Sequence, residues 1–178
     1  MTGVQTCALP ICLLGWGIVP PVVEREGPRG IGSMQLFIAH DPNEHYFAVR
    51  GQERLHPQYV GLAAFDLLTN NADRKGGHML LGHTGHVWAI DNALTFHRIE
   101  KLRTVIWDFS GERVPDALLA DIERVMRWVR DEAPESQAFR ALITSAEVDA
   151  FVRRCATLLA EPVLPEMYAW RCVPWPLV

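Results

Sequence analysis

The segment from residue 56 to residue 70 most strongly constrains how this chain can fold. Pro57 suits the first turn of a helix. The apolar side chains that follow cover most of the circumference of such a helix: Tyr59, Val60, Leu62, Ala63, Phe65, Leu67 and Leu68. A helix that is apolar on all sides has to be surrounded by other elements. The sequence therefore predicts a body built around a buried helix.

Two more helices are predicted in the last third of the chain. The first opens at Pro115, after which apolar side chains recur at helical spacing on one face: Leu118, Ile122, Val125 and Val129. Thr144 and Glu147 form a capping box at the start of the second. Cys155 lies on the apolar face of that helix, where we expect it to be a buried core residue.

The first half of the chain has mixed patterns. The short apolar run Met34–Ala39 predicts a strand. Gly27–Gly32 is rich in glycine and predicts a turn, and the polar stretch Asp41–Arg50 predicts a loop. Together with the helical half, these patterns indicate an α+β fold that is mainly helical.

A β-hairpin is predicted where two short apolar segments, Met79–Leu81 and His86–Ile90, flank the turn Gly82–Gly85. Because an antiparallel hairpin brings its two open ends together, Asp73 and Asp91 should meet there. Two convergent carboxylates suit metal-assisted phosphoryl transfer or general acid–base catalysis. The same spacing also fits a structural role, with Asp73 capping a turn beside a solvated Arg74 and Asp91 closing the hairpin.

Composition excludes several classes of protein. Apolar residues make up 49 % of the 178 residues and charged residues 21 %, which excludes wholesale disorder. The 17 Lys and Arg against 21 Asp and Glu give a net charge of −4, so we expect no nucleic-acid partner. The cysteines have no metal-binding spacing, which favours a reducing cytoplasm: Cys7, Cys12, Cys155 and Cys172.

The N-terminal residues need separate treatment. Residues 1–12 (MTGVQTCALPIC) resemble the translation of a sequencing adapter, which implies that the native chain begins near Leu13. The apolar run Ala8–Val23 lacks a basic start, contains three prolines and is too short to span a bilayer. We therefore expect no transmembrane segment.

Two motifs resemble those of a known family. Asp73–His78 (DRKGGH) and Ile90–Ala93 (IDNA) are similar to the catalytic loop and the metal-binding segment of phosphatidylinositol 3-/4-kinase-like proteins, in particular a bacterial branch of unknown substrate. The resemblance covers residues 13–178 and includes Thr95–His97 and Pro174–Pro176. It implies a protein-kinase-like C-terminal lobe with an interlobe linker at about residues 33–50.

The resemblance also implies roles for individual residues. Asp73 would be the catalytic acid, and Asp91 and His78 would be metal ligands. Backbone groups of the linker would pair with adenine at Phe37, Ile38 and Ala39. The implied cofactors are ATP and Mg²⁺, and the implied partners are a nucleotide and an unknown phosphoacceptor. His78 stands where relatives have a metal-binding Asn, and imidazole suits Zn or Fe better than Mg.

Parts of such a kinase are absent from the sequence. No Lys precedes Lys75, and we find no Gly-rich phosphate-binding loop that follows a strand in this region. We therefore expect a C-terminal lobe without its N-terminal lobe, and no activity from the chain as it stands. Two alternatives remain: a non-catalytic pseudokinase or binding module, and a metal-dependent hydrolase that uses histidines near Asp91, namely His78, His83, His86 and His97.

Overall fold

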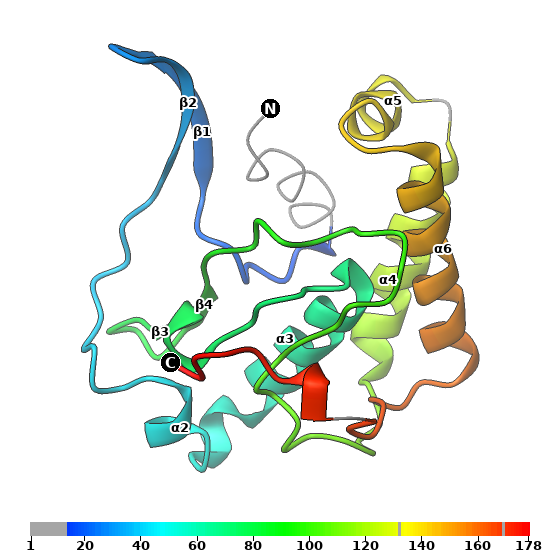
Figure 1. Ribbon diagram of the computed structural model, residues 1–178. Helices are drawn as coiled ribbons and strands as arrows, with labels where there is room; N and C mark the ends of the chain where they lie inside the picture. Colours follow the sequence, from blue (N-terminus) through cyan, green and yellow to red (C-terminus); the bar gives the residue numbers. More distant parts are fainter. Residues whose placement is uncertain (1–13, 132, 169) are drawn as a thin grey trace.

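Helix α3 (His56–Thr69) passes through the centre of the computed structural model, which describes residues 14–131, 133–168 and 170–178. The adapter-like residues 1–12 lie outside the described part. Figure 1 shows α3 between a small β-hairpin on one side and two long helices on the other. The side chains of Tyr59, Phe65 and Leu68 on this helix have at most 1 % exposure. The prediction of a central buried helix is confirmed.

The end of α3 directs the chain toward the predicted catalytic loop. Asn70 follows the helix with a positive φ of 56°, and its N–H bonds to the carbonyl oxygens of Asp66 and Leu67. Asparagine is one of the few residues that adopt this left-handed conformation readily. The helix therefore stops at Thr69, and the loop that carries Asp73 begins immediately after it.

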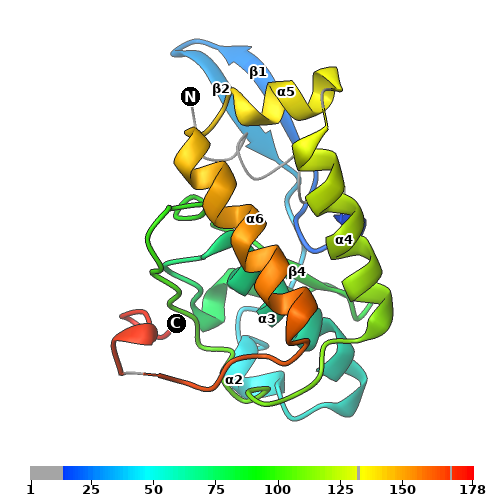
Figure 2. The same ribbon diagram turned by 90° about the vertical axis from the view of Figure 1, so that its right-hand side faces the viewer.

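Three further helices form the other half of the fold: α4 (Asp116–Arg130), α5 (Pro134–Arg140) and α6 (Ser145–Ala160). Figure 2 shows α6 beside α4, and α6 also contacts α3. The predicted capping box of Thr144 and Glu147 is present, and Cys155 is buried as expected. Helix α5 was not anticipated, because seven residues are too few to show a periodic pattern.

A first hairpin corrects the prediction for residues 27–39. Strands β1 (Val22–Gly27) and β2 (Gly30–Gln35) pair antiparallel around a two-residue turn. Gly30 has a φ of 98°, which is accessible to glycine. The predicted strand at 34–39 is therefore wrong, since β2 ends at Gln35. Most side chains of this hairpin are exposed, so it has no buried apolar face that would reveal its strands in the sequence.

The second hairpin confirms the prediction for residues 79–90. Strands β3 (Met79–Leu81) and β4 (Val87–Ala89) pair antiparallel, with Met79 opposite Ala89. The loop predicted over 41–50 contains a short helix, α2 (Tyr46–Val49), whose Tyr46 is fully buried. The fold class is thus α+β, with two small antiparallel sheets and mainly helical secondary structure.

Short 3-10 turns complete the described elements: η1 (Glu53–Leu55), η2 (Gly76–His78) and η3 (Trp170–Cys172). Among the described residues, no helix combines the length and the apolar character that crossing a bilayer requires.

Candidate active site

The open end of the β3–β4 hairpin brings the two predicted aspartates together. The backbone N–H of Ile90 donates to the carbonyl of His78 at 2.9 Å, which extends the pairing toward the open end. One side-chain ligand atom from each of Asp73, His78 and Asp91 lies within 4.8 Å of the other two. The prediction that Asp73 and Asp91 meet, with His78 beside them, is confirmed.

Within this cluster each side chain has a close charged or polar neighbour. His78 Nε2 lies 3.6 Å from Asp91 Oδ2, and Lys75 Nζ lies 3.2 Å from Asp73 Oδ2. The Asp91 side chain is 57 % exposed, whereas those of Asp73, Lys75 and His78 are mostly covered. The cluster is thus reachable from solvent on the Asp91 side, where a ligand could enter.

The surroundings of His78 shift its pKa downward, which favours the neutral imidazole. Burial lowers the pKa of its imidazole and the nearby Arg74 lowers it further, while the charges of Asp91 and Asp73 oppose the shift. Its Nδ1 is buried and has no hydrogen-bond partner among the described residues. A neutral imidazole keeps a lone pair, which is the form that binds metal ions.

A buried ion pair lies directly beneath the cluster. Arg74 donates from Nε to both carboxylate oxygens of Asp66 at 3.1 Å and from Nη2 to Asp66 Oδ1 at 3.0 Å. Both side chains are completely buried. Asp66 belongs to α3, so the pair attaches the loop after Asp73 to the central helix. The interpretation of Arg74 as a solvated neighbour is therefore wrong.

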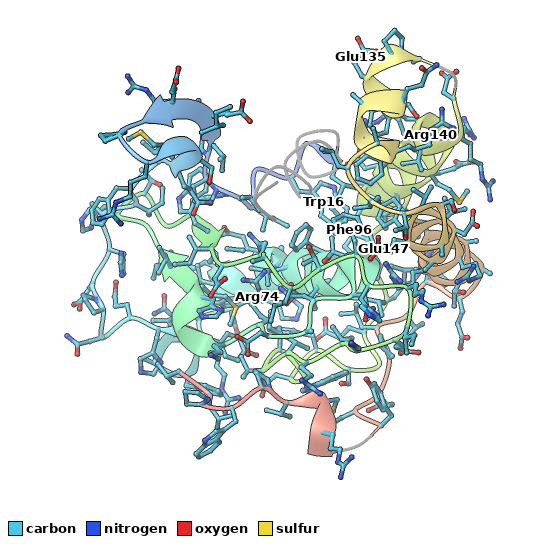
Figure 3. The ribbon with its side chains drawn as sticks, turned by 45° about the horizontal axis from the view of Figure 1, so that its top comes forward. Trp16, Arg74, Phe96, Glu135, Arg140 and Glu147 are labelled. Atoms are coloured by element: carbon cyan, nitrogen blue, oxygen red, sulfur yellow. The ribbon has the colours of Figure 1, made fainter. Side chains whose placement is uncertain are left out.

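The same arginine also holds the other side of the cluster. Its Nη1 donates to the carbonyl of Ile90 at 2.8 Å, and its Nη2 donates to Oδ1 of Asn92. These two residues flank Asp91, whose backbone has a positive φ of 53°. Figure 3 shows Arg74 in the interior of the fold, beside the β3–β4 hairpin. One guanidinium group therefore positions the chain on both sides of the cluster.

Two polar side chains complete the surroundings of Asp66. Asn71 Nδ2 donates to Asp66 Oδ1 at 2.9 Å, and Thr104 Oγ1 donates to Oδ2 at 3.3 Å. Asn71 Oδ1 also accepts from the N–H of Asp73 at 3.0 Å. Sequence reasoning missed Asp66, although an acidic residue within an otherwise apolar helix was a signal that could have found it.

The C-terminal segment supports the loop from its other side. The N–H of Gly76 donates to the carbonyl of Leu177 at 2.7 Å. A Cβ on Gly76 would lie 2.9 Å from Cε2 of Phe47 and 3.3 Å from the Leu177 oxygen. Glycine is needed here because the loop passes between α2 and the C-terminal segment.

The linker residues named for adenine binding lie between β2 and α2. Phe37 is 82 % exposed, Ile38 is buried, and Nδ1 of His40 lies 2.8 Å from the Ile38 carbonyl oxygen. His40 pairs with Gly82 beside the second hairpin, and Figure 1 shows the linker running down that side of the molecule. An adenine contact at Phe37, Ile38 or Ala39 stays a prediction.

The remaining candidate histidines do not join the cluster. His83 is exposed, His86 Nε2 lies 3.0 Å from the Gly17 carbonyl oxygen, and His97 Nδ1 accepts from the N–H of Ile99 at 3.0 Å. In the described part of the chain, Asp73, His78 and Asp91 form the one group of three or more potential metal ligands.

Comparison with known proteins places the chain in a family. No family model and no solved structure matches it. It is 35 % identical over 196 residues to Protein Rv2133c of Mycobacterium tuberculosis (strain ATCC 25618 / H37Rv), an alignment that covers 92 % of this chain and 70 % of the mycobacterial protein. Identity and coverage at this level mean that the chain belongs to the family of Protein Rv2133c.

Proposed function

We propose that this chain is the C-terminal lobe of an ATP- and Mg²⁺-dependent phosphotransferase of the phosphatidylinositol 3-/4-kinase-like superfamily. The observation that carries the proposal is the convergence of Asp73 and Asp91 at the open end of the hairpin. Arg74, which follows Asp73, bonds to Asp66 of α3 and to Ile90 and Asn92 on either side of Asp91. The order of the DRKGGH and IDNA motifs around that hairpin supports the same assignment.

Asp73 is the candidate for accepting the proton of the phosphoacceptor hydroxyl. Its carboxylate is mostly covered, and its backbone N–H bonds to Asn71, which restrains the loop. Lys75 lies 3.2 Å from the same carboxylate and can balance the negative charge that gathers during phosphoryl transfer. Positioning and charge balance are most of what such a site contributes.

Asp91 is the candidate metal ligand. It is the most exposed member of the cluster, and its carboxylate lies within reach of the other two ligand atoms. Two carboxylates with access to solvent fit Mg²⁺, which prefers hard oxygen ligands and retains several waters. When bound, Mg²⁺ would neutralise phosphate charge beside Asp73.

His78 makes the donor set different from an all-oxygen site. Its imidazole has a lowered pKa and lies close to Asp91, and a set of two carboxylates and one imidazole also suits Zn²⁺. This observation favours a metal-dependent hydrolase as the second candidate function. The two candidates predict opposite metal preferences: Mg²⁺ for the phosphotransferase and Zn²⁺ for the hydrolase.

Metal titration of the purified chain separates these functions. Isothermal calorimetry with Mg²⁺, Mn²⁺ and Zn²⁺ should give one weak Mg²⁺ site that is lost in Asp91→Asn. Asp116→Asn is the matched control, because Asp116 is an exposed aspartate at the start of α4.

A stoichiometric Zn²⁺ site with no Mg²⁺ binding would favour the hydrolase. Binding of neither metal, together with an intact fold, would favour the non-catalytic module. Equal Mg²⁺ binding by Asp91→Asn and the parent protein would contradict the assignment of Asp91.

A further inference from the structure

A cavity lies away from the aspartate cluster. It has a volume of about 650 Å³ and lies between α6, the turn at residues 98–100 and the segment 161–166. Figure 2 shows this segment leaving the end of α6. The residues that line it include none of Asp73, His78 or Asp91. Its volume is in the range of cavities that bind small molecules.

The lining of this cavity includes an arginine with unused hydrogen-bond donors. Arg154 Nε donates to the carbonyl of Leu68 near the end of α3 at 2.7 Å. Its Nη2 is buried and has no partner among the described residues. Burial lowers the pKa of the guanidinium to about 10, so the group stays charged at neutral pH. A buried charged donor without an acceptor is costly, so an anion that reached this guanidinium would gain a charge-assisted hydrogen bond.

The other charged residues around the cavity are also left without ion pairs. Arg98 and Arg153 contribute positive charge, and the negative charges come from Glu100, Glu161 and Glu166. In the ranges that the structure describes, none of these side chains, nor Arg154, is within 4.0 Å of an opposite charge. The Glu100 carboxylate acts on the Arg154 guanidinium from a longer distance, so an incoming anion competes with that attraction rather than with an ion pair.

Most of the remaining lining is apolar and includes Leu67, Leu158 and Leu164, and Thr157 adds a hydroxyl group. A cavity that combines apolar walls with a few polar groups suits an organic molecule better than an inorganic ion. The three glutamates oppose a polyanion such as a triphosphate, because like charges repel. The lining therefore favours a compound with a single anionic group and an apolar body.

We propose that this cavity is a binding site for a small organic anion, with the carboxylate or phosphate group on Arg154 and the apolar body against Leu67, Leu158 and Leu164. Arg153 contributes further positive charge at the exposed edge of the cavity. The site does not depend on the proposed phosphotransferase function, since it shares no residue with the aspartate cluster.

Calorimetric titration with matched probes tests the proposal. Benzoate and phenyl phosphate carry the two anionic groups on the same ring, and benzamide is the uncharged counterpart of benzoate. We expect saturable binding of at least one anion at one site. Benzamide should bind at least about tenfold more weakly, because its neutral amide cannot form a charge-assisted hydrogen bond with arginine. Benzoate binding alone identifies a carboxylate site, and phenyl phosphate binding alone identifies a phosphate site.

Variants identify the residues responsible. Arg154→Gln should weaken anion binding at least about tenfold, and Arg153→Gln should weaken it to a smaller extent. Arg127→Gln is the control, because Arg127 is an exposed arginine of α4 that pairs with Glu123 and does not line the cavity. Circular dichroism checks the fold of each variant. If Arg154→Gln does not fold, the exposed Arg153→Gln decides the question.

Two results would overturn the proposal. The first is no saturable binding of either anion by the parent chain. The second is equal affinity in the folded Arg154 and Arg153 variants and in the Arg127 control.

Discussion

Arg74 and Asp66 form an ion pair with no exposed side-chain surface, in which Arg74 Nη2 lies 3.0 Å from Asp66 Oδ1. The pair connects the central helix α3 to the loop that carries Asp73, and the same guanidinium reaches the backbone beside Asp91. The guanidinium group of Arg74 therefore restrains the backbone next to both aspartates of the candidate site.

Breaking the buried pair should destabilise the whole fold. Arg74→Gln leaves the charge of Asp66 buried and unpaired, so we expect the free energy of unfolding to fall by about 3–5 kcal/mol. Urea denaturation measures the change. Arg113→Gln breaks the exposed pair with Asp116 and should cost at most about 1 kcal/mol. Equal losses of unfolding free energy in the two variants would contradict the larger contribution assigned to the buried Arg74–Asp66 pair.

The two aspartates should have separable roles in a chimera that carries the N-terminal region of an intact relative ahead of residue 14. Asp91→Asn should weaken Mg·ATP binding at least about tenfold, since it removes a hard oxygen ligand. Asp73→Asn should retain binding and lower phosphate transfer by about 10²–10⁴-fold, the usual range for a general base. Nucleotide titration and release of labelled phosphate measure these effects.

For the chain as it stands, we expect no measurable ATP turnover, since no Lys precedes Lys75 to hold the nucleotide phosphates. In the chimera, binding and turnover equal to those of the parent in both variants would make the aspartates structural. Asp116→Asn is the control for the loss of one surface carboxylate.

Gly76 should tolerate no side chain. Gly76→Ala places a methyl group 2.9 Å from Cε2 of Phe47, so we expect a loss of about 1–3 kcal/mol from overpacking. Gly51→Ala is the matched control, because a Cβ there meets no atom within 4 Å. Thermal unfolding measures both changes. Phe47→Leu should recover part of the loss in the double variant, and no recovery would contradict the contact with Phe47.

Cys155 should be protected from alkylation in the folded protein. Burial raises the pKa of its thiol from 9.0 to about 12, so almost no thiolate forms at pH 8. Iodoacetamide labelling followed by peptide mass spectrometry should modify Cys155 only when urea unfolds the chain. Rapid labelling without urea would contradict the burial.

The same shift makes a contribution to stability that depends on pH. The folded state holds the proton of Cys155 more tightly than the unfolded state does, so this contribution is fully present below about pH 9. It is lost as pH rises from about 9 toward about 12.

Local patterns in the sequence were sufficient to predict several elements. The apolar circumference of α3, the periodicity of α4 and the capping box of α6 depend on residues within a few positions of one another. The turn between β3 and β4 is equally local. Because a hairpin joins its own ends, it also allowed the meeting of Asp73 and Asp91 to be predicted.

The β1–β2 hairpin and the buried contacts of Asp66 and Arg74 could be identified only from the tertiary structure. The exposed strands of that hairpin lack an apolar face, so no periodic signal marks them. The partners of Asp66 lie 8 residues away at Arg74 and 38 residues away at Thr104, and the loop at Gly76 meets Leu177. A sequence shows that a polar residue is present, but its burial and its partner depend on which distant segments the fold packs together.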